Sequence, residues 1–317
     1  MGKIIIFGGA GFIGNYLTKK LAQNPLDSID VIDNFSRAVE QGSDIISAEN
    51  VNYISMDIAN NFEPDKLSNA YDEVYILASV VGVDYVLNNP TFVLTENMKI
   101  ISNLFSWLQH VAVSRVLYTS TSEVYAGAVQ SGIANLPTNE DVPVMIEEIG
   151  HPRFTYAITK AYAEALFINA ANETSFKSIV VRYHNVYGNK MGNRHVLPHL
   201  VKRFGEENPF TIYGCDQTRS FNHVDDAVNG TIIAMRNGAS GNIYHVGTDV
   251  EVTIEQLTRY VGSLLGYEGD YQYADPYPGS VKRRMPDISK LRALGYEPLI
   301  DWKAGVAEYV RNEKSLM

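Results

Sequence analysis

The feature that most constrains this chain is a glycine-rich stretch near its start, which follows a short apolar run. The run at residues 4–7 has the length and composition of a strand buried on both faces. Glycines follow at once, at spacings that fit either Gly8, Gly11 and Gly14 or Gly9, Gly11 and Gly14, and apolar residues at helical spacing come next. A strand, a glycine turn and a helix N-terminus together predict a phosphate-binding site, because free N–H groups and the positive end of the helix dipole meet there.

A carboxylate at the end of the next apolar run extends this interpretation to a dinucleotide. Residues 29–32 have the pattern of a second buried strand, and Asp33 follows it. Its distance from the glycines, roughly 20 residues, is the one expected for an acid that binds a ribose 2′-hydroxyl. The alternative is a tight turn in another α/β fold. Asp33 favours NAD over NADP, because its carboxylate would repel a 2′-phosphate, whereas Arg37 nearby would attract one.

Composition limits the class of protein. The 317 residues are 45% hydrophobic and 20% charged, as is typical of a globular chain. A net charge of -10 argues against nucleic-acid binding, which needs a basic face. The chain has one cysteine, Cys215, so we expect neither disulfides nor a cysteine-based metal site, and we expect no metal elsewhere. Since we find no signal peptide and no apolar run long enough to cross a bilayer, we expect a cytoplasmic protein.

Strand-like and helix-like patterns alternate through the first half of the chain. This alternation predicts an α/β fold, a Rossmann-type doubly wound parallel sheet. The expected strands are residues 3–7, 29–32, 51–55, 74–77, 115–119 and 178–182, and the expected helices are 12–23, 91–111 and 155–172. Later elements are short and separated by Pro and Gly. We therefore divide the chain into a dinucleotide-binding domain, residues 1–187, and a smaller substrate-binding lobe, residues 188–317, with segments around 221–247 returning to the first domain.

Further contacts to the dinucleotide are expected where strands end, because ligands of open α/β sheets bind at the carboxyl ends of the strands. The expected residues flank the glycines and Asp33 or follow the next strands: Phe12, Ile13, Asn34, Asp57, Ile58, Leu77 and Ala78. We expect Asp57 and Ile58 to contact an adenine. The alternative is that Asp57 is an ordinary turn residue.

A tyrosine and a lysine point to proton-transfer chemistry. Tyr156 and Lys160 lie four residues apart in an expected helix and therefore share one face. A nearby ammonium favours phenolate over phenol, so we expect Lys160 to lower the pKa of Tyr156 toward that of a useful general base. Hydroxyls crowd the end of the fifth strand, and among them Thr121 can hold the same substrate oxygen. The alternative, a surface tyrosine and a solvated lysine, does not explain why the pair accompanies a glycine turn and a hydroxyl cluster.

These residues resemble the extended short-chain dehydrogenase/reductase family, the NAD-dependent nucleotide-sugar epimerases and dehydratases, over nearly the whole chain. The similarity lies in the glycines, Asp33, the Thr-Ser-Glu-Val-Tyr run at 121–125 and the Tyr156/Lys160 pair. It implies NAD as cofactor, with Lys160 holding the nicotinamide ribose, and a transient 4-keto sugar. It also implies a UDP-, GDP-, dTDP- or CDP-linked sugar as substrate, and a homodimer built from the helices around 91–111 and 155–172.

The resemblance also implies residues that bind the nucleotide sugar. The segment at 182–188 is similar to a family segment whose asparagine, here Asn185, contacts the substrate diphosphate. Arg219 and Arg284 match arginines that bind the same diphosphate, and their guanidinium groups suit a bidentate grip on phosphate. The expected set is completed by Ser122, His184 and Arg194. The alternatives are a buried imidazole for His184 and ordinary surface charge for Arg194.

Glu123 bears on the type of reaction more than any other residue. Simple 4-epimerases of the family have a small or apolar residue here, related 4,6-dehydratases have a glutamate that removes the C5 proton, and UDP-glucuronate decarboxylases carry the same Thr-Ser-Glu-Val-Tyr run. We therefore expect Glu123 to act as an acid or base at C5 or C6, the alternative being a hydrogen bond at the strand end.

These considerations favour a lyase outcome, 4,6-dehydration or decarboxylation, over C4 or C3/C5 epimerisation. A non-catalytic NAD-binding regulator is a distant alternative, because it would not need an intact Tyr156/Lys160 pair. Two departures leave the substrate open. Ser122 stands where most 4,6-dehydratases have an aspartate, and residues 126–152 match none of the family templates.

Overall fold

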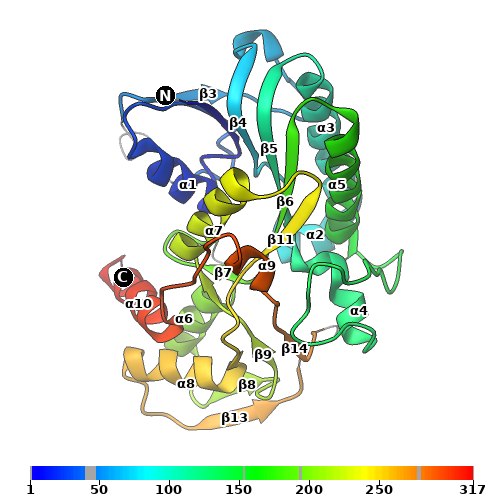
Figure 1. Ribbon diagram of the computed structural model, residues 1–317. Coiled ribbons are helices and arrows are strands. Elements are labelled where there is room, and N and C mark those ends of the chain that lie inside the picture. Colours follow the sequence, from blue (N-terminus) through cyan, green and yellow to red (C-terminus); the bar gives the residue numbers. More distant parts are fainter. Residues whose placement is uncertain (1, 40–47, 153, 193–194, 277–279, 317) are drawn as a thin grey trace.

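A parallel sheet of seven strands forms the larger part of the molecule (Figure 1). The computed structural model describes residues 2–39, 48–152, 154–192, 195–276 and 280–316. The sheet has the order β11-β6-β5-β4-β1-β2-β3, with bounds β1 (Lys3–Phe7), β2 (Ser28–Asp33), β3 (Val51–Ser55), β4 (Ala70–Ile76), β5 (Ala112–Thr121), β6 (Lys177–Tyr183) and β11 (Asn242–Val246). The direction of succession reverses between β1 and β4. In an open α/β sheet this reversal opens a ligand crevice at the carboxyl ends of the strands.

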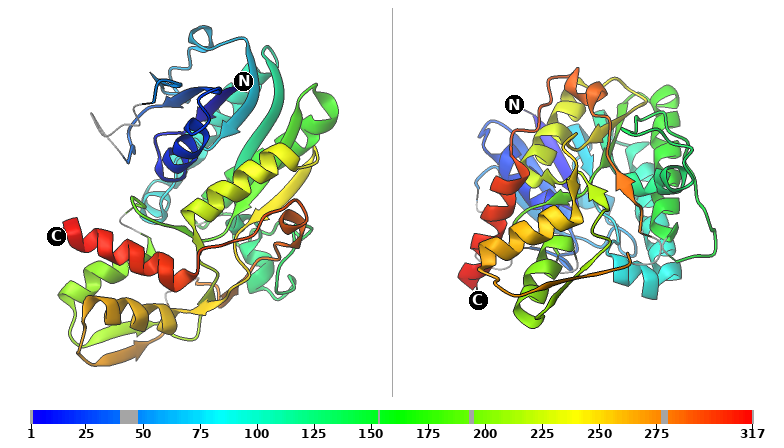
Figure 2. Two further views of the ribbon diagram at one scale, coloured as in Figure 1. Left: turned by 60° about the vertical axis from the view of Figure 1, so that its left-hand side comes forward. Right: turned by 90° about the horizontal axis from the view of Figure 1, so that it is seen from below.

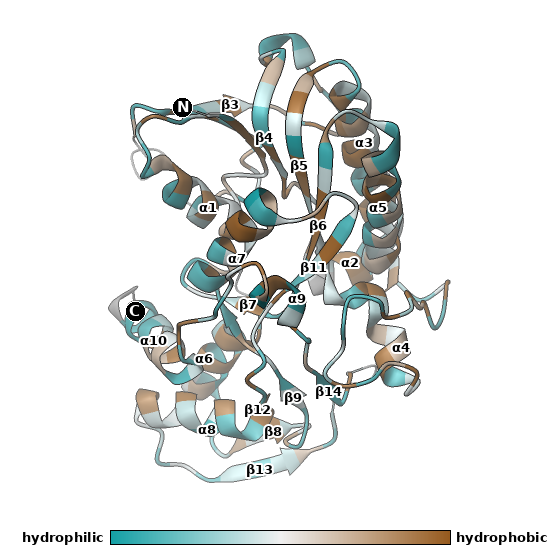
Figure 3. Ribbon diagram, in the orientation of Figure 1, coloured by the Kyte–Doolittle hydropathy of each residue, from teal (hydrophilic) through white to brown (hydrophobic). Residues whose placement is uncertain are grey.

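Helices cover both faces of the sheet, which explains why β1 is apolar from Ile4 to Phe7 (Figure 2). Alternate side chains of β1 enter two different cores: Ile5 and Phe7 pack on one face, and Ile4 and Ile6 on the other. The first face is covered by α3 (Pro90–Leu108) and α5 (Phe154–Glu173), the second by α1 (Phe12–Ala22), α7 (Val224–Asn237) and α9 (Ser289–Arg292). In Figure 3 hydrophobic and hydrophilic stretches interleave along α3 and α5.

A smaller lobe lies beyond the carboxyl ends of the strands and has its own hydrophobic core. Its helices are α6 (Val196–Glu206), α8 (Ile254–Leu265) and α10 (Trp302–Leu316). Its short strands are β7 (Val186–Tyr187), β8 (Phe210–Tyr213), β9 (Thr218–Arg219), β10 (Asn222–His223), β12 (Val252–Thr253), β13 (Tyr271–Ala274) and β14 (Arg283–Arg284). They form the small sheets β10-β7, β12-β9-β14 and β13-β8. The remaining short helices are α2 (Val83–Asn88), α4 (Ala126–Gln130), η2 (Pro64–Lys66) and η3 (Ser122–Tyr125).

The predicted fold class is confirmed, and the differences lie in the bounds of elements. The helix expected at 91–111 ends at Leu108, and the strand expected at 115–119 extends over Ala112–Thr121. The segment expected to return to the first domain contains α7 and β11, and β11 pairs with β6 in the main sheet. The division of the chain at residue 187 stays a prediction.

A buried ion pair fastens the sheet to α5. Arg182, at the end of β6, donates two hydrogen bonds of 2.8 Å to the two carboxylate oxygens of Glu164, and both residues are almost fully buried. A third hydrogen bond, of 3.1 Å, joins Arg182 Nη1 to the main-chain oxygen of Glu140. The bidentate geometry satisfies both charges away from water, and removing one partner leaves the other uncompensated.

We expect Glu164→Ala to lower the free energy of unfolding by about 3–5 kcal/mol, because it strands the Arg182 guanidinium in the interior. Glu206→Ala is the control. It removes an exposed pair with Lys202 on α6, where the N···O distance is 3.8 Å, and should cost less than about 1 kcal/mol. Urea unfolding of the two variants beside the wild type measures both values. Equal losses would contradict this account of the buried pair.

Candidate active site

The glycine turn brings the end of β1, the start of α1 and the segment after β4 into contact. Gly8 has a φ of +86°, and a Cβ built on it would lie 2.6 Å from the nitrogen of Ala78. A Cβ on Gly14 would collide with the Gly8 oxygen, whereas one on Gly11 would have an ordinary contact of 3.6 Å. Gly8 and Gly14 are therefore required for close packing, and Gly11 caps α1. This cradle fits a dinucleotide diphosphate.

Four residues that we expected to contact the dinucleotide lie next to the glycine turn. Phe12 and Ile13 form the first turn of α1, and the N–H groups of Leu77 and Ala78 both donate to the Phe7 oxygen at 2.8 Å. A residue that the sequence did not single out, Asn97 on α3, fixes the loop that follows Ala78. Its amide oxygen accepts from the Ser79 hydroxyl and the Val80 N–H, at 3.0 and 2.7 Å. The available signal was an amide at helical spacing from apolar residues of α3, Val93, Ile100 and Ile101, which places it on their buried face.

Asp33 lies at the end of β2, beside the glycine turn. Its two carboxylate oxygens accept hydrogen bonds from the N–H groups of Ala10 and Phe35, at 3.0 and 2.9 Å. Burial raises the pKa of Asp33, and these N–H groups oppose that rise. Asn34 closes the following turn by accepting hydrogen bonds from Ser36. The arrangement places a fixed carboxylate where a ribose diol is expected and is unsuited to a 2′-phosphate.

The side chains of the turn after β3 contact the protein itself. The Asp57 carboxylate accepts hydrogen bonds from the N–H groups of Ala59 and Asn60, at 2.9 and 3.1 Å. Ile58 is 5% exposed and packs in the core under α3. A contact from this turn to an adenine would therefore come from the main chain, and the binding role of Asp57 and Ile58 stays a prediction.

Tyr156 and Lys160 share the buried face of α5 as expected, but the expected electrostatic relation is wrong in this structure. Lys160 Nζ lies 5.5 Å from the centre of the Tyr156 ring and donates a hydrogen bond of 2.8 Å to the Thr119 oxygen. Burial lowers the pKa of Lys160 to about 7. Burial also raises the pKa of Tyr156, the charge of Glu123 raises it further, and Arg37 lowers it. Desolvation outweighs the ammonium that the sequence suggested as the tuning group.

The hydroxyl-bearing residues at the end of β5 are followed by Glu123, which forms an ion pair with the lobe. Thr121 caps η3, since its Oγ1 accepts a hydrogen bond of 3.3 Å from the N–H of Glu123, and Ser122 is buried. Glu123 Oε1 lies 2.5 Å from Arg284 Nη1, with the Arg284 side chain 9% exposed and the Glu123 side chain 31% exposed. Two residues that the sequence assigned separately, one to catalysis and one to substrate binding, therefore contact each other across the crevice.

A second expected arginine lies beside the first. Arg219 on β9 and Arg284 on β14 are register partners on neighbouring parallel strands. Arg219 Nη2 donates to the Ser280 hydroxyl at 3.2 Å, and Nη1 donates to the Thr218 oxygen at 2.7 Å. Two guanidinium groups at one level of a small sheet form a basic site in an acidic protein. Arg194 lies outside the described residues.

His184 lies beneath the site rather than lining it, which corrects the expectation that it reaches the sugar. Its ring is fully buried, and Nε2 lies 2.5 Å from the hydroxyl of Tyr125. Burial, helped by Arg284, lowers the pKa of His184 to about 3, so the ring is neutral. Asn185 has a φ of 39°, a left-handed conformation that asparagine tolerates, and its amide donates to the Ser220 oxygen at 3.2 Å.

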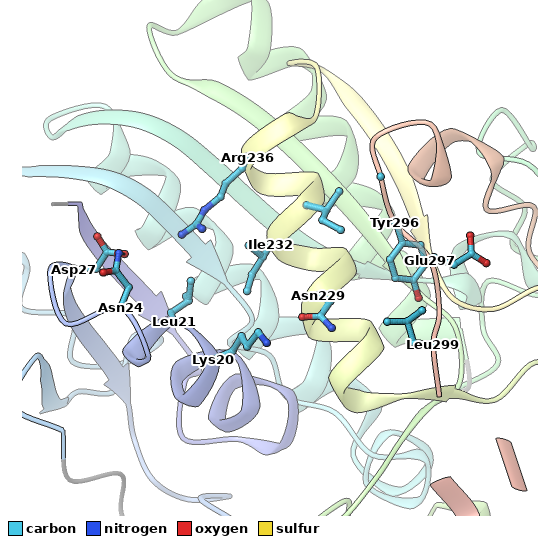
Figure 4. Close-up of a pocket in the computed structure, with 12 residues that line it drawn as sticks. Lys20, Leu21, Asn24, Asp27, Asn229, Ile232, Arg236, Tyr296, Glu297 and Leu299 are labelled. Atoms are coloured by element: carbon cyan, nitrogen blue, oxygen red, sulfur yellow. The ribbon is translucent and has the colours of Figure 1, made fainter. Parts of the chain in front are cut away.

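The pocket in Figure 4 lies elsewhere, between α1, α7 and the segment at 295–299. Lys20 and Arg236 line it together with the apolar side chains of Leu21, Ile232 and Leu299. None of the residues assigned to the dinucleotide or to catalysis lines it. In the described part of the chain, no three His, Cys, Asp or Glu residues are grouped so as to hold a metal ion. No helix there is long and apolar enough to cross a membrane.

Comparisons with known proteins agree with this geometry. Residues 4–247 match the model of the NAD dependent epimerase/dehydratase family. UDP-glucuronic acid decarboxylase 1 of Xenopus tropicalis is 30% identical, over 98% of this chain and 72% of its own length. UDP-N-acetyl-alpha-D-glucosaminuronate decarboxylase of Bacillus cytotoxicus is 26% identical, over 98% and 97%. The structure of UDP-glucuronic acid 4-epimerase from Bacillus cereus with UDP-glucuronic acid and NAD has a TM-score of 0.85 and 25% identity, covering 99% of this chain and 100% of that one.

The depressed pKa of Lys160 has a consequence for stability. Between the folded value of about 7 and the ordinary value of 10.5, folding releases a proton, so the free energy of unfolding of the cofactor-free protein rises with pH. Lys160→Met lacks this contribution. We expect the stability difference, wild type minus variant, to increase between about pH 7 and pH 9, at up to about 1.4 kcal/mol per pH unit. Urea unfolding at several pH values measures it, and a difference independent of pH would show that Lys160 keeps its proton.

Proposed function

From the premise that the chain belongs to the NAD-dependent epimerase/dehydratase family, we propose that it decarboxylates a nucleotide-diphosphate hexuronate through a 4-keto intermediate. The chain is an NAD-dependent enzyme of this family, whose members act on nucleotide sugars. The observation that carries the finer proposal is the ion pair between Glu123 and Arg284 at the end of β5. It puts a cation and an acid–base group at one position in the crevice.

The names of the relatives support a substrate with a carboxylate at C6. The two relatives from Xenopus tropicalis and Bacillus cytotoxicus are named as decarboxylases of UDP-linked uronic acids. The Bacillus cereus epimerase is bound to UDP-glucuronic acid. A guanidinium can bind a carboxylate through two parallel hydrogen bonds. Because Arg284 already pairs with a carboxylate, that of Glu123, we assign it to the C6 carboxylate instead of the diphosphate that the resemblance implied, and leave the diphosphate to Arg219.

The first step is oxidation at C4. Tyr156 takes the proton of the C4 hydroxyl, and the Thr121 hydroxyl orients the same oxygen. Lys160, one turn along the same helix as Tyr156, would hold the nicotinamide ribose beside them. NAD, held by the glycine turn and Asp33, would supply the acceptor for the C4 hydride and its donor at the end of the cycle. These residues lie on β5 and α5, which are packed against each other, and this supports a proton-transfer site that is formed before the substrate binds.

The second step is loss of carbon dioxide. The C4 ketone is β to the C6 carboxylate, so the electrons of the C5–C6 bond flow into the carbonyl as carbon dioxide leaves, and an enolate remains. A substrate carboxylate at Arg284 competes with Glu123 for the guanidinium. Two carboxylates at one cation raise the pKa of Glu123, which then takes a proton from solvent and delivers it to C5. The same residue pair thereby binds the leaving carboxylate and supplies the proton that replaces it.

Dehydration is less well supported by the residues. Loss of a C6 hydroxyl needs an acid at the leaving oxygen, and the residue beside Glu123 is a buried serine, Ser122. Epimerisation at C4 is the second candidate function, because the Bacillus cereus 4-epimerase has 25% identity and a TM-score of 0.85. In that case Glu123 and Arg284 would only hold the carboxylate, and the product would have the mass of the substrate.

We also propose that the protein forms a homodimer through α3 and α5. Four large apolar or aromatic side chains on α2, α3 and α5 are exposed by about two fifths or more of their surface: Tyr85, Leu87, Phe92 and Tyr162. The rings of Tyr85 and Phe92 are in contact, with centroids 6.0 Å apart, so these residues form part of one patch. Exposed apolar patches of this kind mark protein interfaces.

We expect Phe92→Glu to convert the dimer to a monomer, because the substitution would bury a charge in the interface. Sedimentation equilibrium of the variant and the wild type measures the effect. Leu299→Glu is the control, because Leu299 is 78% exposed but lies on the opposite face of the sheet, beside α7. A monomeric wild type, or a dimer that survives Phe92→Glu, would contradict this interface.

We expect Glu123→Gln to lower turnover by about 10²–10⁴-fold while sugar oxidation persists, because the variant cannot deliver a proton to C5. Reduced nicotinamide should then accumulate on the protein, where its absorbance measures it. Glu251→Gln is the matched control, since Glu251 pairs with Arg283, the residue next to Arg284, at 2.8 Å. A Glu123→Gln variant that turns over as the wild type does would remove Glu123 from the mechanism.

A further inference from the structure

The side chain of Arg37 spans from the segment after β2 to the segment after β4, at the edge of the sheet where a dinucleotide is expected. Arg37 belongs to the segment that follows β2, and its Nη1 donates a hydrogen bond of 2.7 Å to the oxygen of Val81, which follows β4. In the sheet, β1 lies between β2 and β4. The side chain therefore passes the carboxyl end of β1, where the glycine turn begins.

Two further observations bring the guanidinium close to the lobe and to the catalytic tyrosine. A Cβ built on Gly192, at the start of the lobe, would lie 3.9 Å from Arg37 Nη2. Burial dominates the pKa values of both Tyr156 and His195, and the positive charge of Arg37 lowers both. The group is thus within electrostatic reach of the catalytic end of the crevice while its backbone stands at the end that holds Asp33.

The dinucleotide has to pass the same position. Asp33 marks the end that binds the adenosine ribose, and Tyr156 marks the nicotinamide end. The diphosphate joins these two halves at the N-terminus of α1. There the protein offers glycine N–H groups and a helix dipole, which together amount to about half a positive charge. The diphosphate is an anion and the protein has a net charge of -10. A full positive charge at this point would therefore balance diphosphate charge that the glycine turn alone leaves unbalanced.

We propose that Arg37 is a phosphate-binding residue of the cofactor site and that its guanidinium contacts the diphosphate of bound NAD. In the structure its Nη1 donates a hydrogen bond to the neutral carbonyl of Val81. A phosphate oxygen is a stronger acceptor for a guanidinium, which presents a fork of N–H groups and can keep the carbonyl as well. The side chain points toward Val81 and away from Asp33, where the ribose 2′-position is expected. We therefore do not assign Arg37 to the binding of a 2′-phosphate.

Equilibrium binding to the full-length protein, freed of bound nucleotide, tests this assignment. We expect Arg37→Ala to weaken NAD and ADP by a common factor of about ten, and to leave UDP unchanged, because ADP carries the cofactor's diphosphate and UDP the substrate's. Arg37→Lys should recover part of the loss. Arg311→Ala, which removes an exposed cation from α10, should change neither ligand.

Salt provides an independent readout. We expect the dissociation constant of NAD to rise with ionic strength more steeply in the wild type than in Arg37→Ala, because the variant has lost a charge–charge contact. A loss confined to UDP would assign Arg37 to the substrate, and a loss confined to NADP would assign it to a 2′-phosphate. Either result, or unchanged binding of NAD and ADP, would overturn the proposal.

Discussion

The ion pair between Glu123 and Arg284 joins the two parts of the molecule at the position where the sugar is expected. Glu123 follows the central strand β5, and Arg284 belongs to a three-stranded sheet of the lobe. Because Arg284 is almost fully buried, its positive charge needs a negative partner, which is Glu123 or an anion that replaces it. A substrate carboxylate can take that place, and binding of substrate is thereby coupled to the protonation state of the group that acts on it.

The pair keeps its geometry because the surrounding main chain is fixed on both sides. The N–H of Thr138 donates to the Met285 oxygen at 2.9 Å, and the N–H of Asp287 donates to the Thr138 oxygen at 2.7 Å, so Thr138, within residues 126–152, fixes the main chain directly after Arg284. Beneath it, the neutral ring of His184 contacts Tyr125. The long segment that matched no family template thus serves to hold a residue of the site.

Local patterns in the sequence predicted the parts of the site that depend on neighbouring residues. The spacing of Gly8 and Gly14, and of Tyr156 and Lys160, follows from one turn and one helix, and the structure has both. The contact between Glu123 and Arg284 spans 161 residues, and no pattern in the sequence encodes that distance. The shift in the pKa of Lys160 could not be predicted either, because its size depends on how completely burial of α5 against the sheet removes the ammonium from water.

The central claim is that the enzyme removes the C6 carboxylate of a nucleotide-linked hexuronate. Mass spectrometry of the products formed from UDP-glucuronic acid tests it most directly, with UDP-glucose as a substrate that lacks the carboxylate. The account predicts a product of UDP-glucuronic acid that has lost carbon dioxide, with a proton at C5 taken from solvent, and no change in mass for UDP-glucose. An isomer of unchanged mass from UDP-glucuronic acid, or loss of water from UDP-glucose, would contradict it.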